Sequence, residues 1–395
     1  MTQHNTFARI RFGVIALSLV AAACSPQAVP TIAPTAVPAT SAPAASSVDP
    51  AAALKELETT VYSTGPHGES PASAADVVLT DDEVAQVKGM QATAAIVLHY
   101  GGNDWSTAQV AGLQAEFARL GIEVIAVTDA NFQPQKQVSD LETVMAKNPD
   151  IIVSIPTDPV ATADAFKKAA EAGIKLVFMD NVPNDMTAGT DYVSVVSADN
   201  YGNGVASALI AAQKMGGQGK IGLIYHGADF FVTKQRYDGF KKTLTDSFPG
   251  IQVVAEQGIG GPDFAGDAEK AASAMLTKYP DLTAIWAVWD VPAAGVLAAI
   301  RSSGRTDVQV FTQDLGKDVA VELAKNGNIV GLGAQRPFDQ GVTEARLAAY
   351  ALLGKPAPAY VALYALPVTH ENVLEAWQAV YHADPPVDLV EAYVK

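Results

Sequence analysis

Cysteine is almost absent from the sequence: Cys24 is the only one in 395 residues. The chain therefore cannot form an internal disulfide or a cysteine-rich metal site. Basic residues are also scarce, because 26 Lys and Arg face 42 Asp and Glu, which gives a formal net charge of −16. Phosphate binding needs clustered basic side chains, so this balance argues against a nucleic-acid partner.

Familiar catalytic motifs are lacking as well. The sequence has neither a Gly-x-Ser-x-Gly elbow nor a His-Glu-x-x-His helix. Its glycine-rich segment 258–264, "GIGGPDF", has no phosphate-binding lysine. His99 and His226 each end a predicted strand, but two ligands without a third make a poor zinc site. We therefore expect no metal, no cofactor and no catalytic residue.

The apolar run at residues 13–23, "GVIALSLVAAA", is shorter than the about 20 residues that a membrane span needs. It follows Arg9 and Arg11 and ends in small residues, which is typical of a secretory signal peptide at residues 1–23. The three alanines before Cys24 resemble a bacterial lipobox, with Ala21 where leucine is usual. This resemblance implies that Cys24 carries a lipid anchor; an ordinary signal peptide with an incidental cysteine is the alternative.

Two further segments precede the main body of the chain. Residues 24–53 are rich in proline, alanine and threonine, with too few large apolar groups to bury, so they predict a semi-extended spacer. Residues 54–92 form an extension of uncertain role. Within it, Thr80 and Glu83 have the spacing of a capping box and predict a short helix.

From residue 93 onward, apolar segments such as "AAIVLH", "DIIVSI" and "KIGLIYH" alternate with helical segments. Near-continuous apolar strands between helices indicate parallel sheets that are covered on both faces. There are too many units for one comfortable open sheet, which favours two α/β lobes. Ligands of such sheets bind beyond the carboxyl ends of the strands, where this chain places carboxylates, amides and aromatic residues.

Several of these strand ends resemble a known family. The segments "GGNDWSTAQVAGLQAEFARLG", "VFMDNVP", "KQRYDGF", "AVWD", "FTQDLG" and "GAQRP" follow in the order found in type I periplasmic binding proteins of sugar ABC importers, in their ribose-binding-like branch. The resemblance covers about residue 93 to the C-terminus. It implies two doubly wound parallel-sheet lobes joined by a three-crossing hinge, with crossings near Ser197, Gln335 and Pro367. Lobe one would be 93–197 plus 336–366, and lobe two 198–335 plus 367–395.

Carried over position by position, the resemblance implies a cleft between the lobes. Its lining would include Asn103, Trp105, Asp180, Arg236, Phe264, Asp290, Asp314 and Gln335. Three departures fall at ligand-facing positions: Asn181 stands where arginine is usual, Trp289 where asparagine is usual, and Ser106 where a second aromatic is common. These departures place ribose itself in doubt.

The residue types suit a sugar. Carboxylates accept hydrogen bonds from hydroxyls, Arg, Asn and Gln donate them, and aromatic faces cover the C–H surface of the ring. Trp105, which we place on a loop, would complete its burial against the ligand. By itself, Asp314 could equally be the N-cap of the helix that follows it.

The resemblance implies a monomeric extracytoplasmic binding lipoprotein, anchored to the outer face of the bacterial cell membrane or periplasmic. It would hand a monosaccharide or polyol to an ABC permease driven by its ATPase. One alternative is a ligand sensor for a chemoreceptor or a sensor kinase. A second is a lipid-anchored sugar hydrolase that uses Asp180 and Asp290 for acid–base work.

Overall fold

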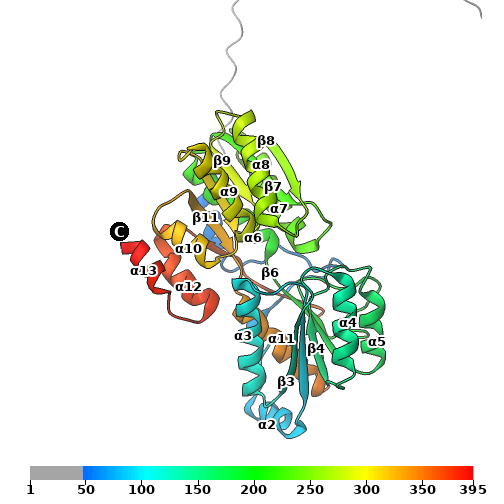
Figure 1. Ribbon diagram of the computed structural model, residues 1–395. Coiled ribbons are helices and arrows are strands. Elements are labelled where there is room, and N and C mark those ends of the chain that lie inside the picture. The colour runs from blue at the N-terminus through cyan, green and yellow to red at the C-terminus, as the bar shows by residue number, and fades with distance from the viewer. Residues whose placement is uncertain (1–47, 395) are drawn as a thin grey trace, which may run out of the picture. The chain divides into compact units, whose positions relative to one another are not determined.

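The computed structural model describes residues 48–394. The predicted signal peptide, Cys24 and nearly all of the predicted spacer lie outside these residues. The described chain contains two sheets, each covered by helices on both faces (Figure 1), so the predicted α/β fold with two lobes is confirmed.

The first sheet has seven strands in the order β1-β12-β6-β5-β4-β2-β3, and all its pairs are parallel. Its strands are β1 (Ala72–Ser73), β2 (Thr93–Leu98), β3 (Glu123–Asp129), β4 (Ile151–Ser154), β5 (Lys175–Met179), β6 (Ser194–Ala198) and β12 (Tyr360–Leu363). Its helices are α2 (Asp81–Met90), α3 (Asp104–Arg119), α4 (Pro134–Met145), α5 (Ala163–Glu171) and α11 (Pro337–Leu352), with a short 3₁₀ turn, η1 (Ala74–Asp76).

The inner strands of the first sheet are buried on both faces, which explains their near-continuous aliphatic sequences. In β2, Ile96 packs with α3 and α11 on one face, and Val97 packs with α4 and α5 on the other (Figure 1). Helices α3 and α11 approach each other closely. A Cβ atom at Gly112 would lie 2.0 Å from the backbone oxygen of Phe338, so only glycine permits this contact.

The second sheet has six strands in the order β13-β11-β10-β9-β7-β8. Its strands are β7 (Gly219–His226), β8 (Ile251–Ile259), β9 (Ala284–Ala287), β10 (Gln309–Gln313), β11 (Ile329–Ala334) and β13 (Leu366–Val368). Its helices are α6 (Asn200–Lys214), α7 (Phe231–Ser247), α8 (Phe264–Lys278), α9 (Asp290–Ser303), α10 (Lys317–Ala324), α12 (Val373–Tyr381) and α13 (Val387–Val394), with the 3₁₀ turn η2 (His370–Asn372) before α12. Strand β13 alone runs antiparallel to its neighbour within this sheet.

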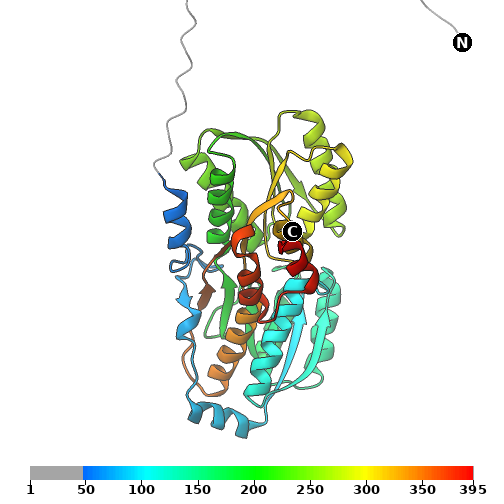
Figure 2. The same cartoon turned by 90° about the vertical axis from the view of Figure 1, so that its left-hand side faces the viewer.

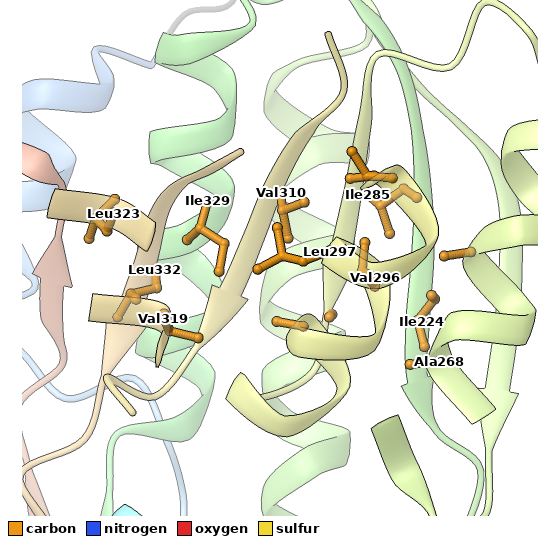
Figure 3. Packing of buried hydrophobic residues seen from close by; sticks show 14 of the residues in the cluster. Ile224, Ala268, Ile285, Val296, Leu297, Val310, Val319, Leu323, Ile329 and Leu332 are labelled. Carbon is orange, nitrogen blue, oxygen red and sulfur yellow. The ribbon is translucent and has the colours of Figure 1, made fainter. Parts of the chain in front are cut away.

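The core of the second sheet also has two halves. On one face, Ile285 lies near Val296 of α9 and Ile329 lies near Leu323 of α10, all within one cluster (Figure 3). On the other face, α6 and α7 cover Trp286, which is fully buried in β9. The chain passes between the two sheets three times, from β6 to α6, from β11 to α11 and from β12 to β13.

The extension before β2 packs against both lobes (Figure 2). Helix α1 (Pro50–Glu56) begins at the N-cap Asp49 and lies on α6, with Leu57 buried beside it. The predicted spacer therefore ends earlier than residue 53, because proline at the first helical position and the Asp49 cap favour a helix. Strand β1 pairs with β12 of the first sheet. The capping box predicted at Thr80 and Glu83 is confirmed at the start of α2.

Asp199, which lies between β6 and α6, holds this extension through hydrogen bonds. Its carboxylate accepts hydrogen bonds from the backbone N–H groups of Tyr62 (2.8 Å) and Ser63 (2.9 Å) and from the Ser63 hydroxyl (2.8 Å). The same carboxylate caps α6 through the Gly202 N–H at 2.8 Å. The burial of Asp199 raises the pKa of this carboxyl despite these donors.

We expect Asp199→Ala to lower the free energy of unfolding by about 3 kcal/mol, because the buried N–H groups of Ser63 and Gly202 would lose the acceptor that the described chain gives them. Urea unfolding measures this change. Asp384→Ala, at an exposed loop position, is the matched control and should change stability by less than about 0.5 kcal/mol. An equally small effect at Asp199 would show that the extension is not held by this carboxylate.

Candidate functional site

A cavity of about 90 Å³ lies between the carboxyl ends of the strands of the two sheets. One buried water needs only about 10–15 Å³, so the cavity has room for a small molecule. Its lining residues are His99, Tyr100, Asn103, Trp105, Phe132, Ile155, Asp180, His226, Phe230, Val232, Thr233, Arg236, Trp289, Asp290, Val291, Asp314 and Gln335. Eight of the eleven residues predicted from the sequence are among them, and Ser106, Asn181 and Phe264 are not.

Arg236, Asp314 and Gln335 form the polar centre of the cavity. Arg236 Nη1 donates to Asp314 Oδ2 at 2.9 Å, and Gln335 Nε2 donates to Asp314 Oδ1 at 3.0 Å. Arg236 Nε also donates to Asn200 Oδ1 at 2.9 Å, which fixes the guanidinium plane. The reading of Asp314 as a helix cap is wrong, because α10 begins only at Lys317, with Gly316 as its N-cap.

Asp180 and Asp314 share an unusual backbone. Both have a left-handed conformation, with φ of 55° and 63° respectively. Such a conformation costs roughly 1–3 kcal/mol for a residue with a side chain and gathers at functional sites. At both positions it directs the chain out of a strand end, β5 for Asp180 and β10 for Asp314.

The three carboxylates of the cavity differ in their surroundings. Asp180 accepts a hydrogen bond from the Ser197 hydroxyl at 2.6 Å, but burial raises its pKa to about 6. Burial, with the nearby Asp314 charge as the second cause, raises the pKa of Asp290 to about 7. Among the described residues, Asp290 Oδ1 accepts only the N–H of Val291, at 2.9 Å, in the first turn of α9.

Trp105 does not lie on a loop, as predicted, but in the first turn of α3. Asn103 is the N-cap of this helix: its Oδ1 accepts the Ser106 N–H at 2.8 Å, and Ser106 completes the capping box. Ser106 therefore holds the helix start and does not line the cavity. Trp105 is half-buried, and its Nε1 is enclosed without a hydrogen-bond partner in the described chain.

Asn181 and Phe264 are the other two predicted residues that do not line the central cavity. Asn181 is 2% exposed, and neither polar atom of its side chain has a partner among the described residues. Phe264 begins α8 and packs edge-on against Trp289, with ring centroids 4.9 Å apart. Phe264 lines a larger neighbouring hollow of about 820 Å³, which shares Phe132 and His226 with the central cavity.

Sequence reasoning missed an aromatic cluster that encloses the cavity. His99, at the end of β2, stacks on Phe230 at 5.9 Å and meets Phe132 at 4.8 Å. His226, at the end of β7, also contacts Phe230, at 5.8 Å. Because Phe132 and Phe230 lie in loops, only the position of the two histidines at strand ends could have indicated the cluster.

Both histidines are neutral near pH 7. Burial lowers the pKa of His99 to about 3 and also lowers the pKa of His226. Among the described residues, no three His, Cys, Asp or Glu side chains gather as a metal site would require.

The lobes also meet beside the cavity. The backbone N–H of Lys317 in α10 donates to Asp104 Oδ2 of α3 at 2.7 Å. His382 of the second lobe lies 2.8 Å from Asp339 of α11 and stacks on Phe338 at 4.4 Å. These contacts close the two lobes over the lining residues.

Known proteins resemble this chain over most of its length. Residues 94–356 match the family described as "Periplasmic binding protein domain". The ribose import binding protein RbsB of Salmonella typhimurium is 28% identical over 270 residues, which cover 68% of this chain and 87% of that protein.

Solved structures agree with this match. A sugar ABC transporter subunit from Rhodobacter sphaeroides superposes with a TM-score of 0.63 at 29% identity, covering 71% of this chain and 99% of that one. An ABC transporter solute binding protein from Agrobacterium vitis with bound allitol superposes with a TM-score of 0.65 at 26% identity, covering 73% of this chain and 98% of that one. With the two-lobed α/β fold, these matches show that the chain belongs to the periplasmic binding protein family, in its type I, ribose-binding-protein-like form.

Proposed function

We propose that this protein is the substrate-binding component of a sugar ABC importer and binds a monosaccharide or a related polyol between its lobes. The Salmonella typhimurium relative is a ribose import binding protein, and the Agrobacterium vitis protein holds allitol. The protein is a binding protein and not an enzyme, so the hydrolase alternative falls away. Its cargo is passed unchanged to a membrane permease and its ATPase.

One observation carries the proposal: hydrogen-bonding groups and aromatic rings from both lobes converge on one small cavity. Asp180 comes from the first lobe, and Arg236, Asp290 and Asp314 come from the second. A polyhydroxylated ligand can bond to both sets at once, and its contacts would favour the closed arrangement of the lobes. A cavity of about 90 Å³ suits one sugar unit better than an oligosaccharide.

The proposed ligand contacts are the predicted residues that line the cavity, namely Asn103, Trp105, Asp180, Arg236, Trp289, Asp290, Asp314 and Gln335. Arg236 and Gln335 hold the Asp314 carboxylate in place, so that it can accept from ligand hydroxyls. The indole rings of Trp105 and Trp289 supply apolar faces for the C–H surface of the ring. Phe264 supports Trp289 from behind the cavity.

We also propose that the protein is anchored outside the cytoplasm through a lipid on Cys24. The support is the lipobox-like position of the only cysteine after an apolar run, followed by a proline-rich stretch. Within residues 48–394, no helix is long and apolar enough to cross a membrane. Labelling with a radioactive fatty acid tests the anchor, because the label should disappear in Cys24→Ser.

Thermal unfolding of the full-length protein against pentoses, hexoses, polyols and amino acids tests the binding function. A ligand at 100 times its Kd adds about 2.7 kcal/mol of stability, which raises Tm by several degrees. We expect this rise with a sugar or polyol. A rise with amino acids only, or no rise with any compound, would contradict the proposal.

A further inference from the structure

The charges that line the cavity do not balance. Three carboxylates, Asp180, Asp290 and Asp314, face one basic side chain, Arg236. Arg236 is already paired with Asp314 at 2.9 Å. Within residues 48–394, neither Asp180 nor Asp290 has a basic group within ion-pair distance. Asp180 is buried and Asp290 is partly buried. An enclosed carboxylate without a counter-ion is costly, so these two carboxylates require a cation or a proton.

No other lining residue supplies that cation. Burial keeps His99 and His226 neutral by lowering their pKa values. Asp180 is partly compensated, because the Ser197 hydroxyl donates to it. In the described part of the chain, Asp290 has a single hydrogen-bond donor, the adjacent Val291 N–H. Its Oδ2 lies against Gly316, because a Cβ atom added there would be 2.1 Å away. Asp290 is therefore the least compensated carboxylate of the cavity.

A second observation is independent of these charges. Gln335 lines the cavity and is 4% exposed. Its Nε2 donates to Asp314, which leaves its Oε1 buried without any donor from the described chain. The cavity thus offers unused acceptors from both Asp290 and Gln335. An ammonium group carries three donors and no acceptor, so it matches this set.

Two indole rings lie beside Asp290. Trp289 precedes Asp290 directly, and Trp105 lines a small second hollow together with Asp290. Indole faces attract cations through the ring quadrupole. We infer that the ligand of this cleft carries a positive charge, as an amino sugar or an aminated polyol does, and that its ammonium group binds at Asp290. This inference rests on the proposed function, since it specifies which sugars or polyols the cleft takes.

Isothermal titration of the full-length protein at pH 7.5 with matched pairs of compounds tests the inference. The pairs are D-glucose and D-glucosamine, D-galactose and D-galactosamine, and D-sorbitol and 1-amino-1-deoxy-D-sorbitol. In at least one pair, the amine should bind about 30-fold more tightly than its neutral partner, as a charge-assisted hydrogen bond provides. Asp290→Asn should reduce that preference to less than about 3-fold, whereas Asp384→Asn, at an exposed loop position, should keep it.

The outcomes separate the inference from the proposed function. If a neutral sugar or polyol binds as tightly as its amine, or if the preference survives Asp290→Asn, the inference is overturned and the binding function stands. If no compound of the pairs or of the wider neutral panel binds, both are overturned. Asp290→Asn keeps the size of the side chain and replaces a carboxyl whose charged form is disfavoured at this position, so the variant should fold.

Discussion

Trp105→Ala is expected to weaken ligand binding by about 100-fold or more, the loss typical of an aromatic residue at the centre of a binding site. Trp105 is half-buried and lines the cavity, and its Nε1 has no partner in the described chain. A bound ligand would cover the ring and can accept from this N–H. Without a ligand, the ring is only partly covered: it packs at the edge of the core of the first sheet and meets His99 at 6.1 Å. We therefore expect the free energy of unfolding to fall by only about 1 kcal/mol.

A second tryptophan provides the control. Trp286 is fully buried in β9 and stacks on Phe240 at 4.9 Å, away from the cavity lining. Trp286→Phe should lower stability by about 1–3 kcal/mol and leave affinity nearly unchanged. Titration calorimetry and urea unfolding of both variants measure the two effects. If Trp105→Ala loses stability like a core variant and keeps its affinity, Trp105 is a packing residue.

Arg236→Met should lower the free energy of unfolding by about 3–5 kcal/mol, as does breaking a buried ion pair from one side. Arg236 is 4% exposed and bonds to Asp314, Asn200 and the Val288 carbonyl. Without the guanidinium, Asp314 would keep a buried charge supported only by the Gln335 amide. Urea unfolding measures the loss, and ligand binding should disappear with it.

The same helix offers a matched control. Lys234 lies two residues earlier in α7, is largely exposed and pairs with Asp238 at the surface, so Lys234→Met should change stability by less than about 1 kcal/mol. The double variant Arg236→Met with Asp314→Asn should recover a large part of the stability, because it removes both charges. A double variant as unstable as Arg236→Met alone would show that the cost does not come from the stranded Asp314 charge.

Much of the cleft could be predicted from the sequence because parallel sheets impose a strong rule. Apolar strands that are covered on both faces can be recognised in the sequence as aliphatic runs, and their carboxyl ends meet at one edge of the sheet. Asp180, Asp290, Asp314 and Gln335 each follow such a run, and all four line the cavity. The helix cap at Thr80 could be predicted as well, since it depends on two residues only three positions apart.

Other features depend on contacts that no local pattern encodes. Phe132 follows β3 in the same lobe as His99, whereas Phe230 precedes α7 in the other lobe and stacks on His99 only because the two lobes meet. The hydrogen bonds of Asp199 also join distant parts of the chain, because their donors Tyr62 and Ser63 lie more than 130 residues away in the sequence.

The sequence by itself determined the fold class, the order of the strand ends and the types of side chain that follow each strand, because these follow from short-range hydrophobic patterning. Only the tertiary structure decided which of those side chains are free for a ligand. Ser106 forms the capping box of a helix start and Phe264 stands behind Trp289, so neither side chain lines the cavity. Hydrogen bonds and ring contacts depend on which distant segments the packed core brings together. In the described chain, this packing places no basic side chain within ion-pair distance of Asp290.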